Sequence, residues 1–399
     1  MVVLINIIKI INLILLSYFA GSGMYFLIFA LASRFYKETK TEKSLQKKRK
    51  AIILIPGYKE DEVIVETAKA AAEHHSNLCH CEVWVIADSF RTQTLNELYK
   101  LPVNTLPVSF TKSTKSKAIR LCLGQLRSDY DYAIVLDADN IPAPGFVDHL
   151  ANRMNKGFSV VQGHRTAKNN NTSLAILDGI SEEVNNAIFR KGHQVLGLSA
   201  SLIGSAFMFD FHLFRALMNE TEAVGGFDKE LELMLAQRNI PIAYAPKAIV
   251  YDEKIQKTSD FVHQRRRWLA AQIKYLSQIS LPQLWHHLSR GDFDYPDKAL
   301  QFIVPPRVLA LGFTSLMTVL QFVLNQYTKS PIFNPQIWGL AFLATALAVT
   351  LSLPVSSYSI KTLRALVSLP KTFGLMVLAL LRSKGANKQF IHTQHGLKH

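Results

Sequence analysis

Long apolar runs lie near both ends of the chain, whereas its middle alternates short apolar runs with helical stretches. The first run, Ile10 to Phe35, is almost wholly apolar, and a membrane-spanning helix needs about 20 such residues. Ala30-Leu31-Ala32 imitates a signal-cleavage site, but the run is too long for the roughly 7–15 apolar residues of a signal peptide. We therefore expect residues 1–36 to form a retained transmembrane anchor.

Three apolar pieces follow near the carboxyl end. Phe302 to Leu324 and Ile337 to Val355 predict two membrane-spanning helices within residues 301–357. The third piece, Leu366 to Leu381, is marginal in length and is flanked by basic residues. We expect residues 358–399 to form an interfacial or re-entrant helix and a cytoplasmic tail, whereas a true fourth span would put that tail outside.

Between residues 51 and 260 the pattern is that of an α/β domain. In chain order the expected elements are a strand at Ala51–Ile55, a helix at Val63–His74, a strand at Val83–Ala87, a helix at Lys115–Leu126 and a strand at Tyr132–Leu136. This order predicts a mostly parallel mixed sheet flanked by helices. Ligands of such sheets bind at the carboxyl ends of the strands.

Acidic residues follow each of these strands. Glu60 comes shortly after the first strand, Asp88 directly after the second, and Asp137 directly after the third. Asp137 and Asp139 stand two residues apart, so in an extended chain their carboxylates point the same way. Carboxylate oxygens suit a hard cation such as Mg²⁺ or Mn²⁺, which can neutralise a departing diphosphate. We expect a metal site at Asp137 and Asp139.

Two later segments also carry candidate chemistry. Gly225 and Gly226 suit a tight turn before a helix whose first turn contains Glu230. That acid either complements the helix dipole or acts as a general base. On a helix, Gln264, Arg267 and Trp268 share one face, where arginine suits phosphate and tryptophan suits a sugar ring.

The distribution of charge along the chain helps to distinguish a membrane protein from a nucleic-acid-binding protein. The net charge is +15, yet charged residues make up only 19% of the chain. Basic residues crowd the linker at residues 37–50, directly after the anchor, as the positive-inside rule predicts for a cytoplasmic segment. This placement favours a membrane protein over a nucleic-acid binder. Three cysteines, two of them in Cys79-His80-Cys81, do not match a disulfide framework or the spacing of a structural zinc site.

Together the motifs resemble those of the membrane-bound family 2 glycosyltransferases, the branch of the cellulose, chitin and hyaluronan synthases, over nearly the whole chain. The motifs that carry the resemblance are Ile55-Pro56-Gly57-Tyr58-Lys59-Glu60 (similar to Pro-x-Tyr-Asn-Glu), Val85-Ile86-Ala87-Asp88, Lys115-Ser116-Lys117-Ala118 (similar to Gly-Lys-x-x-Ala), Asp137-Ala138-Asp139 (DxD), Lys229-Glu230 (at the family's Glu-Asp) and Gln264, Arg267 and Trp268 (QxxRW). The resemblance implies a nucleotide-diphospho-sugar transferase (GT-A) fold over residues 51–260, then the QxxRW motif and interfacial helices over residues 261–300.

The resemblance also implies roles for individual residues. It implies a donor nucleotide site at Glu60, Asp88, Lys117, Asp137, Asp139 and Arg267, a metal at Asp137 and Asp139, a catalytic base at Glu230, and an acceptor end at Gln264 and Trp268. Three departures from the family pattern are Lys59 in place of asparagine, Lys229 in place of an acid, and Glu230 in place of aspartate.

The expected activity is inverting transfer of a sugar from a nucleotide-diphosphate donor, expected to be a uridine-diphosphate sugar, to a glycan or lipid-linked acceptor. The QxxRW motif favours a polysaccharide synthase of the bacterial inner membrane with its catalytic domain in the cytoplasm. Because few spans follow that domain, a second copy or an export partner would complete a pore. Two alternatives are a single-addition transferase on a polyprenyl-linked sugar and a non-catalytic membrane scaffold.

Overall fold

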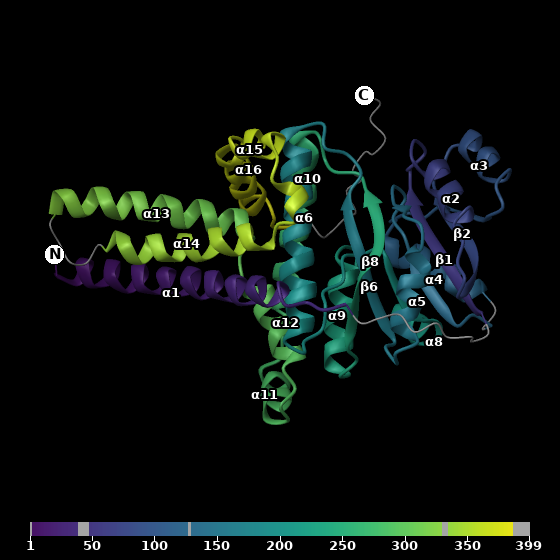
Figure 1. The fold of residues 1–399 in the computed structure, drawn as a ribbon, viewed down its shortest axis with the longest axis horizontal. Coiled ribbons are helices and arrows are strands. Elements are labelled where there is room, and N and C mark those ends of the chain that lie inside the picture. The colour runs from purple at the N-terminus through teal and green to yellow at the C-terminus, as the bar shows by residue number, and fades with distance from the viewer. Residues whose placement is uncertain (1, 39–47, 127–128, 329–333, 386–399) are drawn as a thin grey trace.

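The computed structural model describes residues 2–38, 48–126, 129–328 and 334–385. Most of the predicted basic linker and the tail from residue 386 lie outside these described residues. The described part divides into an α/β domain and a bundle of long helices, which extends to one side of it in Figure 1. Helices α6 (Ser173–Asn186) and α10 (Thr258–Leu276) stand between these two parts.

The α/β domain is built on one mixed sheet of eight strands in the order β3-β2-β1-β4-β7-β6-β8-β5. The strands are β1 (Arg49–Tyr58), β2 (Cys79–Asp88), β3 (Asn104–Val108), β4 (Tyr132–Val135), β5 (Ile141–Pro142), β6 (Val160–Ala167), β7 (Phe207–Asp210) and β8 (Ile242–Asp252). Strands β1 to β4 are mutually parallel where they pair, and β7 runs antiparallel to both β4 and β6. Strand β8 is parallel to β6, so the expected mostly parallel mixed sheet is confirmed.

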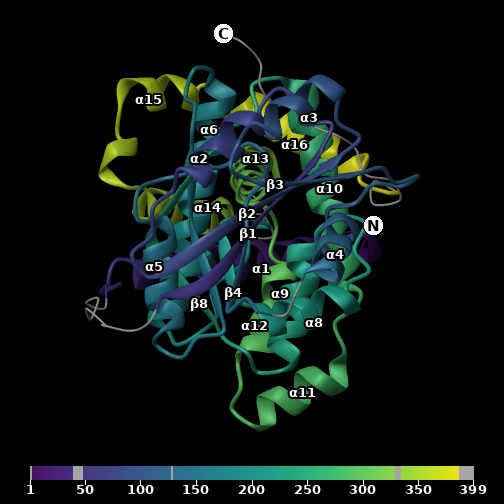
Figure 2. The same ribbon diagram turned by 90° about the vertical axis from the view of Figure 1, so that its right-hand side faces the viewer.

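Helices cover both faces of this sheet. On one face α2 (Ile64–Ala72) and α5 (Phe146–Met154) bury residues such as Ile64 and Leu150 against the strands. On the other face α4 (Lys115–Gln125), α8 (Phe211–Glu220) and α9 (Phe227–Gln237) form a second apolar cluster. Figure 2 shows these two helix groups on opposite sides of the strands. The sheet is therefore buried on both faces, as its nearly continuous apolar strands require.

The remaining elements connect this domain to the bundle or lie at its edges. They are α3 (Thr92–Leu98), the π-helix η1 (Ala187–Gly192), α7 (His193–Val195), α11 (Leu281–Ser289), α12 (Asp294–Ile303), the 3₁₀ turn η2 (Val355–Ser357), α15 (Ile360–Leu366) and α16 (Leu369–Leu381).

Three helices are long and apolar enough to cross a membrane: α1 (Val2–Ser33), α13 (Arg307–Thr328) and α14 (Pro335–Ser352). They run side by side in Figure 1 and share an apolar cluster that contains Phe19, Phe313 and Trp338. The first carboxyl-terminal span begins at Arg307 rather than at Phe302, because Pro305 and Pro306 end α12 and separate it from α13.

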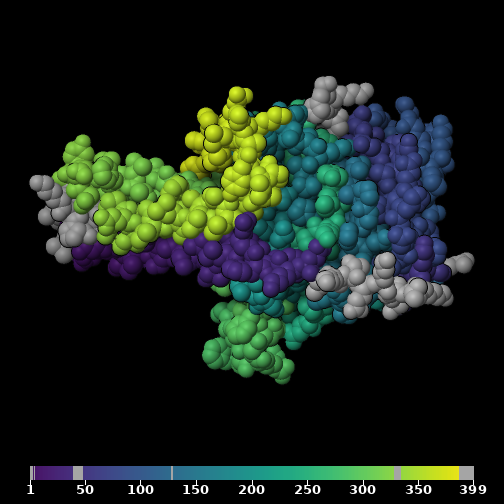
Figure 3. Space-filling model, viewed as in Figure 1, coloured from purple at the N-terminus to yellow at the C-terminus, as the bar shows by residue number. Residues whose placement is uncertain are grey.

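The last apolar piece forms two short helices rather than one. Helices α15 and α16 are bent by 52° at a break, the geometry of a broken span or a re-entrant loop. Residues of α16, such as Met376, share an apolar cluster with Leu269 of α10 and Leu309 of α13. Figure 3 shows α15 and α16 seated in the angle between the bundle and the α/β domain.

A buried polar network fixes α1 to the α/β domain. The Tyr25 hydroxyl donates a hydrogen bond of 2.7 Å to Asp297 of α12 and lies 3.0 Å from Nε2 of His193. The His193 ring in turn lies 3.1 Å from the other Asp297 oxygen and stacks on Phe29 at 3.7 Å between ring centroids. At Gly192 the backbones approach so closely that a Cβ would overlap the carbonyl group of Phe29.

Candidate active site

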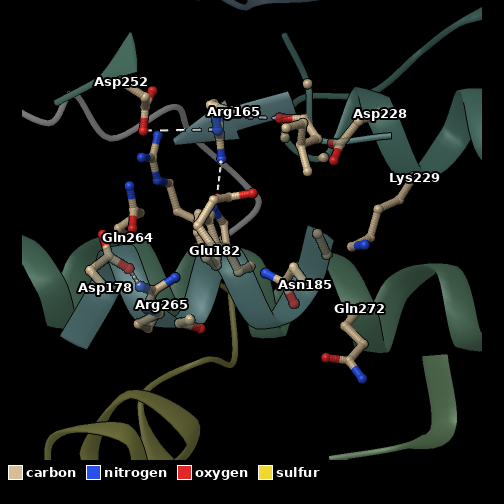
Figure 4. A pocket seen from close by; sticks show the side chains of 18 of the residues that line it. Arg165, Asp178, Glu182, Asn185, Asp228, Lys229, Asp252, Gln264, Arg265 and Gln272 are labelled. Atoms are coloured by element: carbon tan, nitrogen blue, oxygen red, sulfur yellow. Dashed lines mark hydrogen bonds and ion pairs between the residues drawn. The ribbon is translucent and has the colours of Figure 1, made fainter. Parts of the chain in front are cut away.

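A single cavity of about 600 Å³ lies between the carboxyl ends of β1, β2 and β4, the start of α9, and helices α6 and α10. Acidic and basic side chains from these elements line it in roughly equal numbers. Figure 4 shows part of it, with Asp228 and Lys229 on one side, Asp252 and Arg165 on another, and Gln264 and Glu182 on the helices below. The cavity continues past these groups to residues of the membrane bundle, among them Phe26 and Val349.

Three carboxylates converge in this cavity. Asp137, Asp139 and Asp252 each offer an oxygen, and these oxygens lie within 4.8 Å of one another. The spacing fits one hard divalent cation, because Mg²⁺ and Mn²⁺ are bound mainly by oxygen ligands. Asp137 and Asp139 follow β4, whereas Asp252 ends β8, so two distant strands supply the set.

Asn140 holds this set of carboxylates in place. Its side-chain amide donates to Asp139 at 3.2 Å and to Asp252 at 3.0 Å, while its carbonyl oxygen accepts from the Asp137 backbone at 3.1 Å. The residue is fully buried. One amide thus joins the backbone of Asp137 to the carboxylates of Asp139 and Asp252, and so helps the fold to set their relative positions.

Basic side chains surround the three carboxylates. Arg165 lies 3.6 Å from Asp137, 3.8 Å from Asp252 and 3.0 Å from Glu182. Lys254 donates to Asp252 at 2.8 Å. Burial alone would raise the pKa of Asp252, but Arg165 and Lys254 hold it below the ordinary aspartate value. The carboxylate therefore stays ionised and able to bind a cation near neutral pH.

The predicted donor residues Glu60, Asp88 and Arg267 all line the cavity. Asp88 is 2% exposed and accepts a hydrogen bond from Ser89 at 2.9 Å. Burial lowers the pKa of Arg267, while Glu60 and Asp137 act in the opposite direction. Acids and a guanidinium group thus line the same cavity, a combination that can bind a nucleotide.

Lys117, by contrast, is turned away from the cavity. Its ammonium group donates to the Lys112 carbonyl at 3.2 Å on the exposed side of α4. Lys115 lines the cavity instead, where it contacts Asp137 and donates to the Gly204 carbonyl at 2.7 Å. Lys115 stands three positions before Ala118, which is the spacing between lysine and alanine in Gly-Lys-x-x-Ala. This spacing could have identified Lys115, rather than Lys117, as the lysine of the site.

Glu230 and Asp228 also differ in their position relative to the cavity. Glu230 is not among the described residues that line the cavity, and it accepts from the Glu222 backbone at 3.3 Å and from the Tyr275 hydroxyl at 3.4 Å. Asp228 does line the cavity, and its carboxyl carbon lies 3.9 Å from the Cβ position of Gly204. Burial raises the pKa of Asp228, against the opposing effect of Lys229.

The predicted acceptor residues Gln264 and Trp268 line the cavity together with Arg267, as their shared helical face predicts. The Oε1 atom of Gln264 is buried and has no hydrogen-bond partner among the described residues. The Arg265 guanidinium stacks on the Trp268 ring at 4.0 Å and contacts Asp178. Arg265 is therefore held within the site by these contacts.

The site residues that the sequence analysis missed are Lys115, Asn140, Arg165, Asp228, Asp252 and Lys254. Asp252 could have been predicted in the same way as Asp137, because it directly follows an apolar, strand-like run, Ala248-Ile249-Val250-Tyr251. Arg165 and Lys254 carried no such signal, since only the pairing of β6 with β8 brings them to the same edge of the sheet.

Comparisons with known proteins place this geometry in a family. The family model described as "Glycosyltransferase like family 2" matches residues 49–271, more than half of the chain. A search of the curated proteins found no match. Among solved structures, the mannosyltransferase PcManGT from Pyrobaculum calidifontis, in complex with GDP-Man and Mn²⁺, is similar with a TM-score of 0.55 at 12% identity. That match covers 95% of this chain and 98% of the other.

A second similar structure is the glucosyl-3-phosphoglycerate synthase from Mycobacterium tuberculosis in complex with Mn²⁺, uridine-diphosphate and glucosyl-3-phosphoglycerate. It has a TM-score of 0.40 at 15% identity and covers 56% of this chain and 78% of its own. The family match extends from the first residue of β1 into α10 and so contains the acidic set, Asp228 and the QxxRW helix. The chain therefore belongs to the family 2 glycosyltransferases.

Proposed function

We propose that this protein transfers a sugar from a nucleotide-diphosphate donor to an acceptor hydroxyl at a membrane surface, with inversion at the anomeric carbon. The observation that carries the proposal is the convergence of Asp137, Asp139 and Asp252 with Lys115 and Arg165 in one cavity. Carboxylates able to hold a divalent cation, beside basic groups that suit phosphate, are what binding of a diphosphate requires.

In this proposal the donor lies along the carboxyl ends of the strands. Glu60 and Asp88 hold its base and ribose, and Arg267 contacts its diphosphate from α10. A cation held by the three aspartates would supply charge neutralisation for the departing diphosphate. Lys115 lies close enough to Asp137 to serve the same phosphates. Lys117, which the resemblance implied for this role, is replaced by Lys115 because only Lys115 reaches the cavity.

We assign the general base to Asp228 in place of Glu230. Its carboxylate lies in the cavity, and burial raises its pKa, which strengthens it as a proton acceptor from the acceptor hydroxyl. The buried Gln264 oxygen without a described partner would accept a hydrogen bond from the acceptor, and the Trp268 ring would stack on a sugar. The scaffold alternative is disfavoured because each of these groups is present in one cavity.

The acceptor end of the site adjoins helices that are apolar enough to cross a membrane. We propose an integral protein of the bacterial inner membrane whose catalytic domain faces the cytoplasm. The QxxRW motif supports a polysaccharide synthase of the cellulose, chitin and hyaluronan synthase branch, in which a second copy or an export partner completes a pore. The alternative, single addition to a polyprenyl-linked sugar, is supported by the apolar residues at the inner end of the cavity.

The test uses the purified full chain in lipid with a panel of uridine- and guanosine-diphosphate sugars, with and without Mg²⁺ or Mn²⁺. We expect nucleotide release from one donor that depends on the metal, and a product whose length separates processive from single addition. An Asp252→Asn variant should need a higher metal concentration for the same rate. Metal-independent turnover, or an unchanged metal requirement in this variant, would contradict the assigned cation site.

A further inference from the structure

The cavity has an inner arm that the donor and the catalytic base do not use. This arm is the apolar part of the lining, which α13, α14 and α16 supply through Val308, Leu311, Val349, Leu369 and Met376. Neither a nucleotide nor a hydrophilic glycan has the apolar surface needed to pack against these side chains. The arm therefore fits an apolar chain.

A cationic group stands where the charged part of the cavity meets this arm. Arg307, the first residue of α13, lines the cavity and donates to the Ser181 carbonyl at 3.1 Å and the Ser181 hydroxyl at 3.3 Å. Its guanidinium also lies over the Phe189 ring at 5.7 Å. Among the described residues no carboxylate forms an ion pair with Arg307, and the acid that acts on it through the electrostatic field is Glu182.

Glu182, the acid that acts on Arg307, is shared among three other basic side chains. Glu182 lies 3.0 Å from Arg165, 3.5 Å from Arg190 and 3.7 Å from Lys254. These basic groups hold the pKa of Glu182 well below the ordinary glutamate range, although burial acts to raise it. Because Glu182 is shared in this way, it offsets the charge of Arg307 only in part, and two further guanidinium groups, Arg190 and Arg265, act on Arg307 with the same sign. The entrance to the arm therefore favours an anionic ligand.

We propose that the acceptor is a lipid-linked sugar phosphate, with its phosphate group held by Arg307 and its apolar chain in the inner arm. This inference rests on the proposed transfer reaction and names the acceptor class. Arg307 begins a helix long and apolar enough to span a membrane, so its guanidinium lies at the depth of lipid head groups. Along the cavity the order is then donor, Asp228, acceptor sugar, phosphate at Arg307 and chain.

The arrangement explains why charge and apolar surface meet at one point. Arginine binds phosphate through a planar fork of donors, and a phosphate excluded from water forms stronger contacts than an exposed one. Leu366, which also lines the arm, is 40% exposed at the surface, so the arm extends to the outside of the protein beside α15. A chain in the arm can thus continue into the surrounding lipid.

The experiment compares one acceptor sugar in three forms with the full chain in lipid nanodiscs: linked to a polyprenyl diphosphate, linked to an uncharged alkyl chain, and as a soluble sugar phosphate. We expect the polyprenyl diphosphate form to have a KM at least about tenfold below either other form, since only it uses both features. Equal KM values for the charged and uncharged lipids would overturn the proposal.

Two variants and a matched control locate the contacts. Arg307→Gln should raise the KM for the polyprenyl diphosphate form about tenfold or more and leave the alkyl-linked form unchanged. Leu311→Trp should impair both lipid forms and spare the soluble sugar phosphate. Arg364→Gln removes an exposed cation of α15 outside the cavity lining and should change nothing. Equal losses for all three forms in Arg307→Gln would mean a structural role and would overturn the assignment.

Two readouts separate this inference from the proposed function. Metal-dependent nucleotide release without acceptor reports on the donor site and should survive in Arg307→Gln. Direct binding of polyprenyl phosphate, measured by native mass spectrometry, should be retained by the parent chain and lost in Arg307→Gln even if no donor is turned over. If excess anionic phospholipid displaces the polyprenyl phosphate fully, the arm is a general lipid site and the acceptor assignment fails.

Discussion

At the scale of single residues, the start of α9 shows how two neighbouring acids acquire different environments. Asp228 and Glu230 stand two positions apart on a helix, so their side chains point in different directions. One enters the cavity, while the other is held by the Glu222 backbone and the Tyr275 hydroxyl. Sequence spacing relative to a family motif selected Glu230, and only the rotation of the helix distinguishes the two.

We therefore expect Asp228→Asn to lower kcat by about 10²–10⁴-fold, because the base that accepts the hydroxyl proton is lost. Donor affinity should stay nearly unchanged. Glu230→Gln is the matched variant and should retain most of the activity. Steady-state kinetics with measured donor binding checks this, and the reverse ranking of the two variants would restore Glu230 as the base.

The raised pKa of Asp228 also predicts the direction in which kcat changes with pH. A base must be ionised, so kcat should fall as pH drops through this pKa, at a higher pH than an ordinary aspartate with a pKa of about 3.9 would give. The acidic limb of the kcat profile should persist in Glu230→Gln. A profile that stays flat down to the ordinary aspartate range would contradict the assignment of Asp228.

Lys59 illustrates a departure that the structure explains in part. Its backbone φ is +55°, in the left-handed region where asparagine is several-fold enriched among non-glycine residues. The Pro-x-Tyr-Asn-Glu pattern thus has asparagine at a position whose backbone favours it. Here lysine adopts the same conformation, supported by a hydrogen bond of 3.0 Å from its backbone to the Asp88 carbonyl.

At the scale of elements, the parts that sequence reasoning predicted are those with local signals. The strands β1, β2 and β4 and the helices α2 and α4 were expected within a few residues of their observed bounds, because apolar periodicity marks them. The antiparallel strand β7 and the parallel pair β6 and β8 were not, since their positions depend on contacts between distant segments. Asp252 and Arg165 belong to β8 and β6, which is why these two members of the acidic and basic set were not predicted.

The junction of α1 with η1 is a second place where one residue decides how elements pack. A Cβ at position 192 would lie 2.8 Å from the Phe29 carbonyl carbon and 3.1 Å from its Cα, and backbone atoms cannot move aside as a side chain can. We expect Gly192→Ala to destabilise the protein by about 1–3 kcal/mol through overpacking.

Thermal unfolding in detergent checks this expectation, with Gly21→Ala as the control. Gly21 also lies in α1, but no described atom comes within 4 Å of a Cβ added there. The control should keep the parent stability. Equal stability of both variants would show that α1 and η1 separate more easily than their close contact indicates.

At the scale of the whole molecule, three candidate spans and one α/β domain fix a topology that can be tested. By the positive-inside rule, the basic residues that follow α1 in the sequence predict a cytoplasmic catalytic domain. If α1, α13 and α14 are the spans, we expect the amino terminus and the connection between α13 and α14 outside and the carboxyl terminus inside.

Reporter fusions at these three positions check the topology. A phosphatase that is active only outside the cytoplasm should be active at the amino terminus and between α13 and α14, and inactive at the carboxyl terminus. Phosphatase activity at the carboxyl terminus would instead make α15 and α16 one broken span, the fourth crossing that their apolar sequence permits.

The hydrogen bonds of Tyr25 to Asp297 and of Tyr18 to the Ile303 carbonyl join α1 to α12 at two levels. Helices that cross a membrane usually adapt to bilayer thickness by changing their tilt. Here a change in the tilt of α1 would have to rotate the catalytic domain with it. We therefore expect thinner or thicker bilayers to deform around the protein, so that the cavity keeps a constant height above the membrane plane.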